Sequence, residues 1–110
     1  MNRVDGKVAL ISGSARGLGA ETAKVLAAGG AKVVIADILD EVGQRTAAEI
    51  GASAAFVHLD VTSEDSWKAA VKFAAEKFGG LHILVNNAGI FRRQTPEETT
   101  LADWRQMPAV

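Results

Sequence analysis

Four short apolar runs recur along this sequence, and they restrict the possible fold more than any other feature. They cover residues 8–11, 33–36, 54–57 and 83–85, and many of their side chains are β-branched. Each run is continuously apolar rather than alternating with polar residues, which indicates strands buried on both faces, as in a parallel sheet. Such strands need helices on both sides of the sheet.

Segments with helical spacing separate these runs. The first ends at a pair of glycines, which is typical of a helix C-terminus. Its apolar stripe comprises Leu18, Thr22, Val25, Leu26 and Gly29. A more polar helix is predicted over residues 40–50, and a third helix follows a capping signal at Thr62 or Ser63. The stripe of the third helix comprises Trp67, Ala70, Val71, Ala74 and Phe78.

The resulting order of elements is β-α-β-α-β-α-β. Right-handed crossovers between parallel strands make this the N-terminal half of a three-layer α/β fold, a Rossmann-type doubly wound sheet with strand order 3-2-1-4. Residues 1–90 are predicted to form this half-domain. Residues 91–110 are predicted to be a polar loop followed by the start of a helix.

A glycine-rich segment joins the first strand to the first helix. Gly13, Gly17 and Gly19 give it the spacing G-x-x-x-G-x-G, which differs from the G-x-G-x-x-G of the usual dinucleotide fingerprint. A tight turn at a helix N-terminus lets a diphosphate approach main-chain N–H groups, and the helix dipole favours the anion. A plain strand-to-helix turn is the alternative, but the position between strand and helix favours a dinucleotide site.

An acidic residue, Asp37, ends the second strand. A carboxylate at this place can accept both hydroxyls of an adenosine ribose and would repel a 2′-phosphate, which favours NAD over NADP. Arg16 argues the other way, because its guanidinium could pair with that phosphate. We side with Asp37, because a phosphate buried against an unpaired carboxylate is the more unfavourable arrangement. The alternative role for Asp37 is to cap the next helix.

Polar residues also follow the third and fourth strands. Asp60 is placed to receive an adenine amino group, or else to cap the helix that follows. Asn86 and Asn87 leave a buried strand, where amide groups need hydrogen-bond partners. Ala88 and Gly89 after them are small enough to leave room for a ribose. Taken alone, this last segment could equally be an ordinary turn.

The composition excludes several other classes of function. Twelve Lys and Arg residues face 13 Asp and Glu residues, so no strong field attracts nucleic acid or anionic lipid. The absence of cysteine excludes disulfides and thiolate catalysis. Neither His58 nor His82 has a second ligand at metal-binding spacing, so no metal site is predicted. No apolar window reaches membrane-spanning length, and a cytoplasmic location is expected.

Together, in this order and spacing, these motifs resemble the short-chain dehydrogenase/reductase family. The matching segments are Ser12 to Gly19, Asp37, Asp60–Val61 and Asn86 to Gly89. Within the family, the sequence is most similar to the bacterial 3-alpha (20-beta)-hydroxysteroid dehydrogenase branch, with the 3-oxoacyl reductases next. The resemblance implies hydride transfer between NAD(H) and a small alcohol or ketone substrate, such as a hydroxysteroid.

The resemblance also implies roles for single residues. The diphosphate would be lined by Gly13, Arg16, Gly17, Leu18 and Gly19. The adenosine ribose would be held by Asp37 and Ile38, and the adenine by Asp60 and Val61. The remaining riboses would be bordered by Asn86, Ala88 and Gly89, with Asn87 in a more structural role.

The chain departs from the family in its catalytic residues. Family members use a Tyr as acid/base, a nearby Lys and a Ser, all beyond the segment that matches here, and these 110 residues contain no Tyr. We therefore expect no catalytic residue in this chain, which is interpreted as a truncated N-terminal half that is inactive alone and can self-associate through an exposed sheet edge. The alternatives are a non-catalytic NAD-binding or interaction module and, more remotely, an S-adenosylmethionine-dependent methyltransferase.

Overall fold

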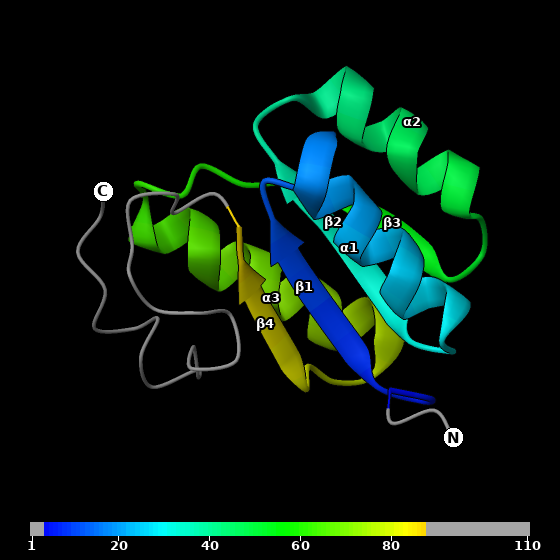
Figure 1. The fold of residues 1–110 in the computed structure, drawn as a ribbon. Helices are drawn as coiled ribbons and strands as arrows, with labels where there is room; N and C mark the ends of the chain where they lie inside the picture. The colour runs from blue at the N-terminus through cyan, green and yellow to red at the C-terminus, as the bar shows by residue number, and fades with distance from the viewer. Residues whose placement is uncertain (1–3, 88–110) are drawn as a thin grey trace.

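The computed structural model describes residues 4–87, which fold into alternating strands and helices (Figure 1). The elements in chain order are β1 (Val8–Ser12), α1 (Gly17–Ala28), β2 (Lys32–Asp37), α2 (Asp40–Ile50), β3 (Ala54–His58), α3 (Glu64–Phe78) and β4 (Ile83–Asn86). This is the predicted order. The predictions for residues 91–110, and those for Ala88 and Gly89, lie outside the described residues.

The four strands form one parallel sheet with the order β3-β2-β1-β4. β1 is central and pairs on one side with β2, where Leu10 is opposite Val34, and on the other side with β4, where Leu10 is opposite Leu84. The predicted order 3-2-1-4 is therefore confirmed. All strands point the same way, so their carboxyl ends and the loops after them gather at one edge of the sheet.

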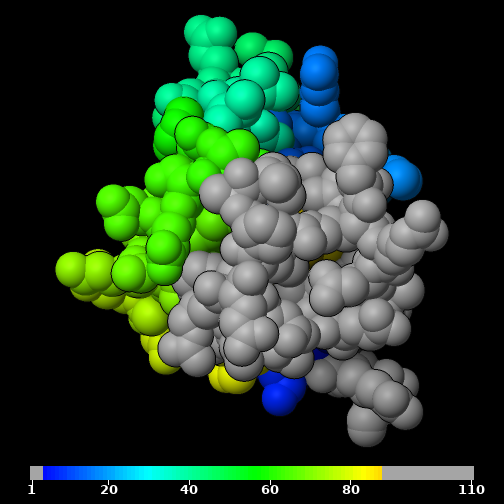
Figure 2. Space-filling model, turned by 90° about the vertical axis from the view of Figure 1, so that its left-hand side faces the viewer, coloured from blue at the N-terminus to red at the C-terminus, as the bar shows by residue number. Residues whose placement is uncertain are grey.

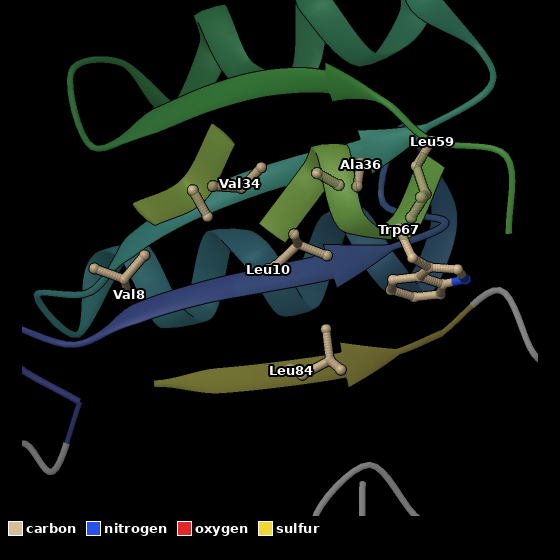
Figure 3. Packing of buried hydrophobic residues seen from close by; sticks show 9 residues of the cluster. Val8, Leu10, Val34, Ala36, Leu59, Trp67 and Leu84 are labelled. Carbon is tan, nitrogen blue, oxygen red and sulfur yellow. The ribbon is translucent and has the colours of Figure 1, made fainter. Parts of the chain in front are cut away.

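Helices cover both faces of the sheet and complete the three predicted layers. On one face α3 packs through Trp67, Ala70 and Ala74 against side chains from three neighbouring strands. Figure 3 shows this core, in which Leu10, Val34 and Leu84 lie on adjacent strands. On the other face α1 and α2 cover a second core; its buried members are Ala9, Ile11, Ala23, Ala31, Val33, Ile35 and Ala47.

The stripe predicted for α1 is correct at Leu26, which packs against the second core, but it is wrong at Leu18 and Val25. Leu18 is 78% exposed and Val25 is 68% exposed. The buried residues of this helix are instead Gly19, Ala20 and Ala23. Small side chains allow the helix backbone to lie close to the sheet, and a pattern search that follows large apolar residues cannot find this kind of contact.

The N-terminus of α3 is capped by one of the two residues predicted from the sequence. The Ser63 side chain accepts a hydrogen bond from the backbone N–H of Ser66 at 3.1 Å, so Ser63 rather than Thr62 is the cap. The helix ends at Gly79, whose φ of +88° is a left-handed conformation that glycine adopts readily. None of the three helices within residues 4–87 combines the length and apolar character needed to cross a bilayer.

Candidate dinucleotide-binding site

The glycine-rich loop after β1 folds back onto the end of β2. Gly13 and Gly17 both have a φ of +66°, which is unfavourable for residues with a side chain. The backbone N–H groups of Gly13 and Ser14 both donate to the carbonyl oxygen of Ala36, at 2.8 and 3.3 Å. The loop is thus fixed to the carboxyl end of β2, at the same edge of the sheet as the other strand-to-helix loops.

Ser14 holds this loop in place, a role that was not predicted from the motif. Its hydroxyl is fully buried, donates to the carbonyl oxygen of Ile11 and accepts from the backbone N–H of Ala36 at 3.0 Å. The hydroxyl therefore bridges the carbonyl oxygen of Ile11 on β1 and the N–H of Ala36 on β2, and it joins the loop to both strands. The only sequence signal for this role is a small hydroxyl residue directly after the first glycine of the motif.

Gly19 lies where the loop and α1 come closest together. A Cβ at this position would be 2.3 Å from the carbonyl oxygen of Gly13 and 2.9 Å from Nδ2 of Asn87. The same Asn87 Nδ2 donates to the Gly13 carbonyl oxygen at 3.3 Å. The close approach of α1 to the loop therefore requires a glycine, and Asn87 fastens the loop to the end of β4.

Asp37 brings the end of β2 into contact with the same loop. Its Oδ2 accepts a hydrogen bond from the backbone N–H of Ala15 at 3.0 Å, and its Oδ1 accepts from the backbone N–H of Leu39 at 3.2 Å. The side chain is half-buried, whereas the next residue, Ile38, is 59% exposed. A carboxylate therefore lies directly beside the glycine-rich loop, with an exposed apolar side chain next to it.

The N-terminus of α1 differs from those of the other two helices. α2 and α3 have acidic residues in their first turns, whereas α1 has none. Like α2, α1 has no side-chain cap, and its N-cap residue is Arg16. Among the described residues, the backbone N–H groups of residues 16–19 meet no protein acceptor. These donors, together with the helix dipole, make this end of α1 electrostatically favourable for an anion.

Asp60 lies in the loop after β3, and its side chain is engaged locally. Its Oδ1 accepts from the hydroxyl of Thr62 at 2.7 Å and from the Thr62 backbone N–H at 3.0 Å. These two hydrogen bonds, the hydroxyl first, lower the pKa of the Asp60 carboxyl below its usual value of 3.8. The carboxyl does not cap α3, because Ser63 does so. Val61 packs against the core beside Trp67, whose Nε1 donates to its carbonyl oxygen at 3.0 Å.

The amide of Asn86 ties β4 to the centre of the sheet. The hydroxyl of Ser12, at the end of β1, lies 2.9 Å from Oδ1 of Asn86 and 3.4 Å from the carbonyl oxygen of Val85. Ser12 and Asn86 are also register partners in the sheet. The last residues of β1 and β4 are therefore linked through side chains as well as through the backbone.

The structure thus brings together some of the predicted site residues more closely than others. Gly13, Gly19, Asp37 and Asn87 belong to one connected set of contacts. In Figure 2 the blue surface of the loop after β1 and the cyan-green surface of the segment after β2 adjoin at the top of the molecule. No described hydrogen bond connects Asp60 to this set, although Asp60 follows a strand of the same sheet.

An open groove of about 560 Å³ lies between α1 and α2, beside the loop. Its walls carry charges of both signs, with Arg16 and Arg45 near Glu21, and with Lys24 paired to Glu49 at 3.7 Å. Arg16 is exposed at the rim of this groove. Its guanidinium forms no ion pair with another described residue.

The sequence is similar to those of known dehydrogenases. Over residues 7–110 the sequence matches the family described as short chain dehydrogenase. The chain is 53% identical over 105 residues to a 3-alpha-(or 20-beta)-hydroxysteroid dehydrogenase of Mycobacterium tuberculosis, which covers 96% of this chain and 40% of that protein. It is 54% identical over 114 residues to a trans-4-hydroxycyclohexanecarboxylate dehydrogenase of Sinomonas cyclohexanicum, covering 96% of this chain and 44% of that protein.

Solved structures show the same relationship. A hydroxysteroid dehydrogenase from Escherichia coli superposes with a TM-score of 0.75 at 42% identity, covering 79% of this chain and 38% of that one. A 3-ketoacyl-(acyl-carrier-protein) reductase from Brucella melitensis, solved in complex with NADH, superposes with a TM-score of 0.73 at 48% identity, covering 74% of this chain and 34% of that one.

The chain spans about 40% of the length of the curated relatives it matches. The family match nevertheless extends over nearly the whole sequence, and the two solved structures cover 79% and 74% of this chain. The resemblance inferred from the motifs is confirmed: this chain belongs to the short-chain dehydrogenase family.

Proposed function

We propose that this chain is the NAD-binding portion of a short-chain oxidoreductase. The observation that carries the proposal is the contact between Asp37 and the glycine-rich loop. It puts a carboxylate, suited to ribose hydroxyls, next to the N-terminus of α1, which is suited to a diphosphate. In a dinucleotide the adenosine ribose is next to the diphosphate, so two adjacent subsites for these groups fit one ligand.

The residues present fit such a cofactor on steric and electrostatic grounds. The absence of side chains at Gly13 and Gly17 gives a diphosphate access to the backbone, and the donors of residues 16–19 are not used by the described protein groups. Each oxygen of Asp37 accepts one backbone N–H, and a carboxylate oxygen can accept further hydrogen bonds from ribose hydroxyls. When bound, the nicotinamide ring would supply or accept the hydride.

The proposed preference is for NAD over NADP. A 2′-phosphate on the adenosine ribose would lie against the carboxylate of Asp37, where like charges repel. Arg16 is exposed at the rim of the groove and would be drawn to the same phosphate, but the carboxylate is already fixed in place by two backbone N–H groups. We therefore infer that the repulsion by Asp37 outweighs the attraction by Arg16.

The proposed reaction of the complete enzyme is hydride transfer between NAD(H) and a hydroxy or keto carbon. The names of the mycobacterial and Escherichia coli relatives support a hydroxysteroid as the substrate class. The acid/base Tyr of the family is not among these 110 residues, which contain no Tyr. These 110 residues alone are proposed to bind cofactor without turnover.

A second candidate is a non-catalytic NAD-binding module. Such a module would use the same loop and the same Asp37, and self-association is its proposed mode of interaction. The proposal is supported by β4, which pairs with β1 on one side and with no described strand on the other. Sedimentation of the chain over a range of concentrations tests self-association, and a monomer at all concentrations contradicts it.

A cytoplasmic location stays a prediction.

Binding of NADH and NADPH to the wild-type chain tests the cofactor proposal. Titration by calorimetry should show NADH bound more tightly than NADPH. Asp37→Asn keeps the size of the side chain and removes its charge, so the ratio of the two dissociation constants should fall about tenfold or more. Glu76→Gln, which removes the same charge from an exposed position on α3, is the matched control and should leave the ratio unchanged. If neither dinucleotide binds, the proposed function is wrong.

A further inference from the structure

A buried hydroxyl on α2 contacts the backbone of the glycine-rich loop. Thr46 is only 7% exposed, and its hydroxyl donates a hydrogen bond to the backbone carbonyl oxygen of Ala15, 31 residues earlier in the chain. Ala15 is itself 1% exposed. This contact joins the middle of α2 to the loop and does not involve the outer surface of the protein.

Ala15 is thereby held at both of its backbone polar groups. Its N–H donates to Asp37 at the end of β2, and its carbonyl oxygen accepts from Thr46 on α2. Two elements that follow the loop in sequence therefore fix the two peptide groups on either side of Ala15. Neither of these peptides can rotate without breaking a hydrogen bond in a buried environment, which is unfavourable.

The contact with Thr46 determines where the next N–H group points. The peptide bond between Ala15 and Arg16 is planar, and in the trans form its N–H points opposite to its carbonyl oxygen. Because that carbonyl points toward α2, the N–H of Arg16 points away from α2. Among residues 4–87 it has no acceptor, and it precedes the free N–H groups of the first turn of α1.

We infer that Thr46 is a positioning residue for the phosphate-binding loop, because it holds the Ala15–Arg16 peptide with its N–H available to a diphosphate. This inference rests on the proposed function of the loop. Thr46 touches no cofactor in this role and acts through Ala15. Without the hydroxyl of Thr46, the buried carbonyl oxygen of Ala15 has lost its hydrogen-bond donor, which favours rotation of the peptide toward another donor.

Two substitutions at this position separate the hydroxyl from the volume of the side chain. Thr46→Val keeps the shape and removes the donor, so affinity for NADH and for ADP should fall about threefold to tenfold. Thr46→Ser keeps the donor and should restore most of this affinity. Adenosine lacks the diphosphate, so its affinity should change less than twofold in either variant. Thr22→Val makes the same change on α1, outside the loop contacts, and should leave all three affinities unchanged.

The outcomes distinguish this inference from the proposed function. If wild type binds no NADH, the proposed function itself fails. If wild type binds NADH and Thr46→Val binds it equally well, only the role of Thr46 is overturned. The role of Thr46 is also overturned if Thr46→Val loses affinity for ADP and for adenosine in equal proportion, because a general structural defect would have that effect.

A measurement on the wild-type chain covers the case in which Thr46→Val fails to fold. Titration with ADP, followed by the amide resonances of ¹⁵N-labelled protein, should shift the Arg16 resonance together with those of Gly17 and Leu18. Adenosine should leave the Arg16 resonance in place. An Arg16 amide that does not respond to ADP overturns the inference.

Discussion

The carboxylate of Asp37 accepts a hydrogen bond at 3.0 Å from the backbone N–H of Ala15, which lies 22 residues earlier in the chain. This single contact joins the end of β2 to the loop after β1. The other carboxylate oxygen of Asp37 accepts a hydrogen bond from the backbone N–H of Leu39 at the start of α2. One side chain therefore organises two successive strand-to-helix connections. Asp37 therefore contributes to the stability of the fold as well as to the proposed site.

Replacing Asp37 by alanine should lower the free energy of unfolding by about 1–3 kcal/mol. The substitution leaves the buried N–H of Ala15 without an acceptor, and the penalty for an unpaired buried donor has this size. Urea denaturation followed by circular dichroism measures the change. Glu76→Ala on the exposed face of α3 is the control and should stay within about 0.5 kcal/mol of wild type. Equal effects of the two substitutions would contradict the structural role of Asp37.

Gly19→Ala should both destabilise the chain and weaken dinucleotide binding. The added methyl group would meet backbone atoms of Gly13 and Ser14 at 2.3 and 2.8 Å, and backbone cannot move aside as a flexible side chain can. Overpacking of this kind lowers stability by about 1–3 kcal/mol. Affinity for NADH should fall with it, because α1 must move away from the loop.

The control for Gly19 is Gly51→Ala, at the end of α2. Gly51 has a φ of +104° but open space where its Cβ would lie. Strain alone should therefore lower stability there by about 1 kcal/mol and leave NADH affinity unchanged. Thermal unfolding and calorimetric titration of both variants make the comparison. A Gly19→Ala chain that binds NADH normally would show that the close approach of α1 is not required.

Thr62→Val should raise the pKa of Asp60. The hydroxyl of Thr62 is the largest cause of the lowered pKa, and valine removes it while the backbone N–H of residue 62 still donates. NMR titration of the Asp60 carboxyl measures the change directly. A titration midpoint that is the same in both proteins would rule out the hydroxyl as the cause.

The lowered pKa of Asp60 also fixes the direction of a pH effect. A carboxyl whose pKa is lower in the folded chain than in the unfolded one stabilises the fold above its unfolded value of 3.8. That contribution is lost as the pH falls through the lower, folded value. Stability measured from pH 5 down to pH 2 should therefore fall slightly less in Thr62→Val than in wild type. The group is exposed, so the difference between the two proteins is small.

His82 should stabilise the chain through the acceptor on its ring. Its Nδ1 accepts a hydrogen bond from the backbone N–H of Val8 at 3.0 Å, and the backbone N–H of His82 donates to the Val8 carbonyl oxygen at 2.9 Å. His82→Leu removes the ring acceptor at the start of β1 and should lower the free energy of unfolding by about 1 kcal/mol. His82→Asn offers an oxygen near the same place and should recover part of the loss in urea denaturation. If both variants match wild type, the ring contact contributes nothing.

The sequence was most informative where local signals and burial agree. The runs at 8–11 and 33–36 are strands because they are apolar and β-branched, and neighbouring glycines mark the turns. The position of Asp37 beside the glycine-rich loop also follows from the sequence, because parallel strands bring their carboxyl ends to one edge. These features depend on spacing along the chain, which a single sequence contains.

Other features depend on contacts between distant residues and could not be predicted. The buried residues of α1 are Gly19, Ala20 and Ala23, and their role depends on how closely the helix approaches the sheet. The contact of Thr46 with Ala15 spans 31 residues, and that of Ser12 with Asn86 spans 74. A hydroxyl residue within a helix carries no local sign that its partner is a loop carbonyl in another part of the fold.

The attachment of Ala15 to both β2 and α2 has a consequence for biosynthesis. The loop is translated before either of its anchors, and the hydroxyl that holds its carbonyl is 31 residues further along. A nascent chain that ends after α1 therefore has the glycine motif but not the conformation that it takes here. If the loop binds a diphosphate as proposed, we expect that affinity only after β2 and α2 have been synthesised and have packed against the loop.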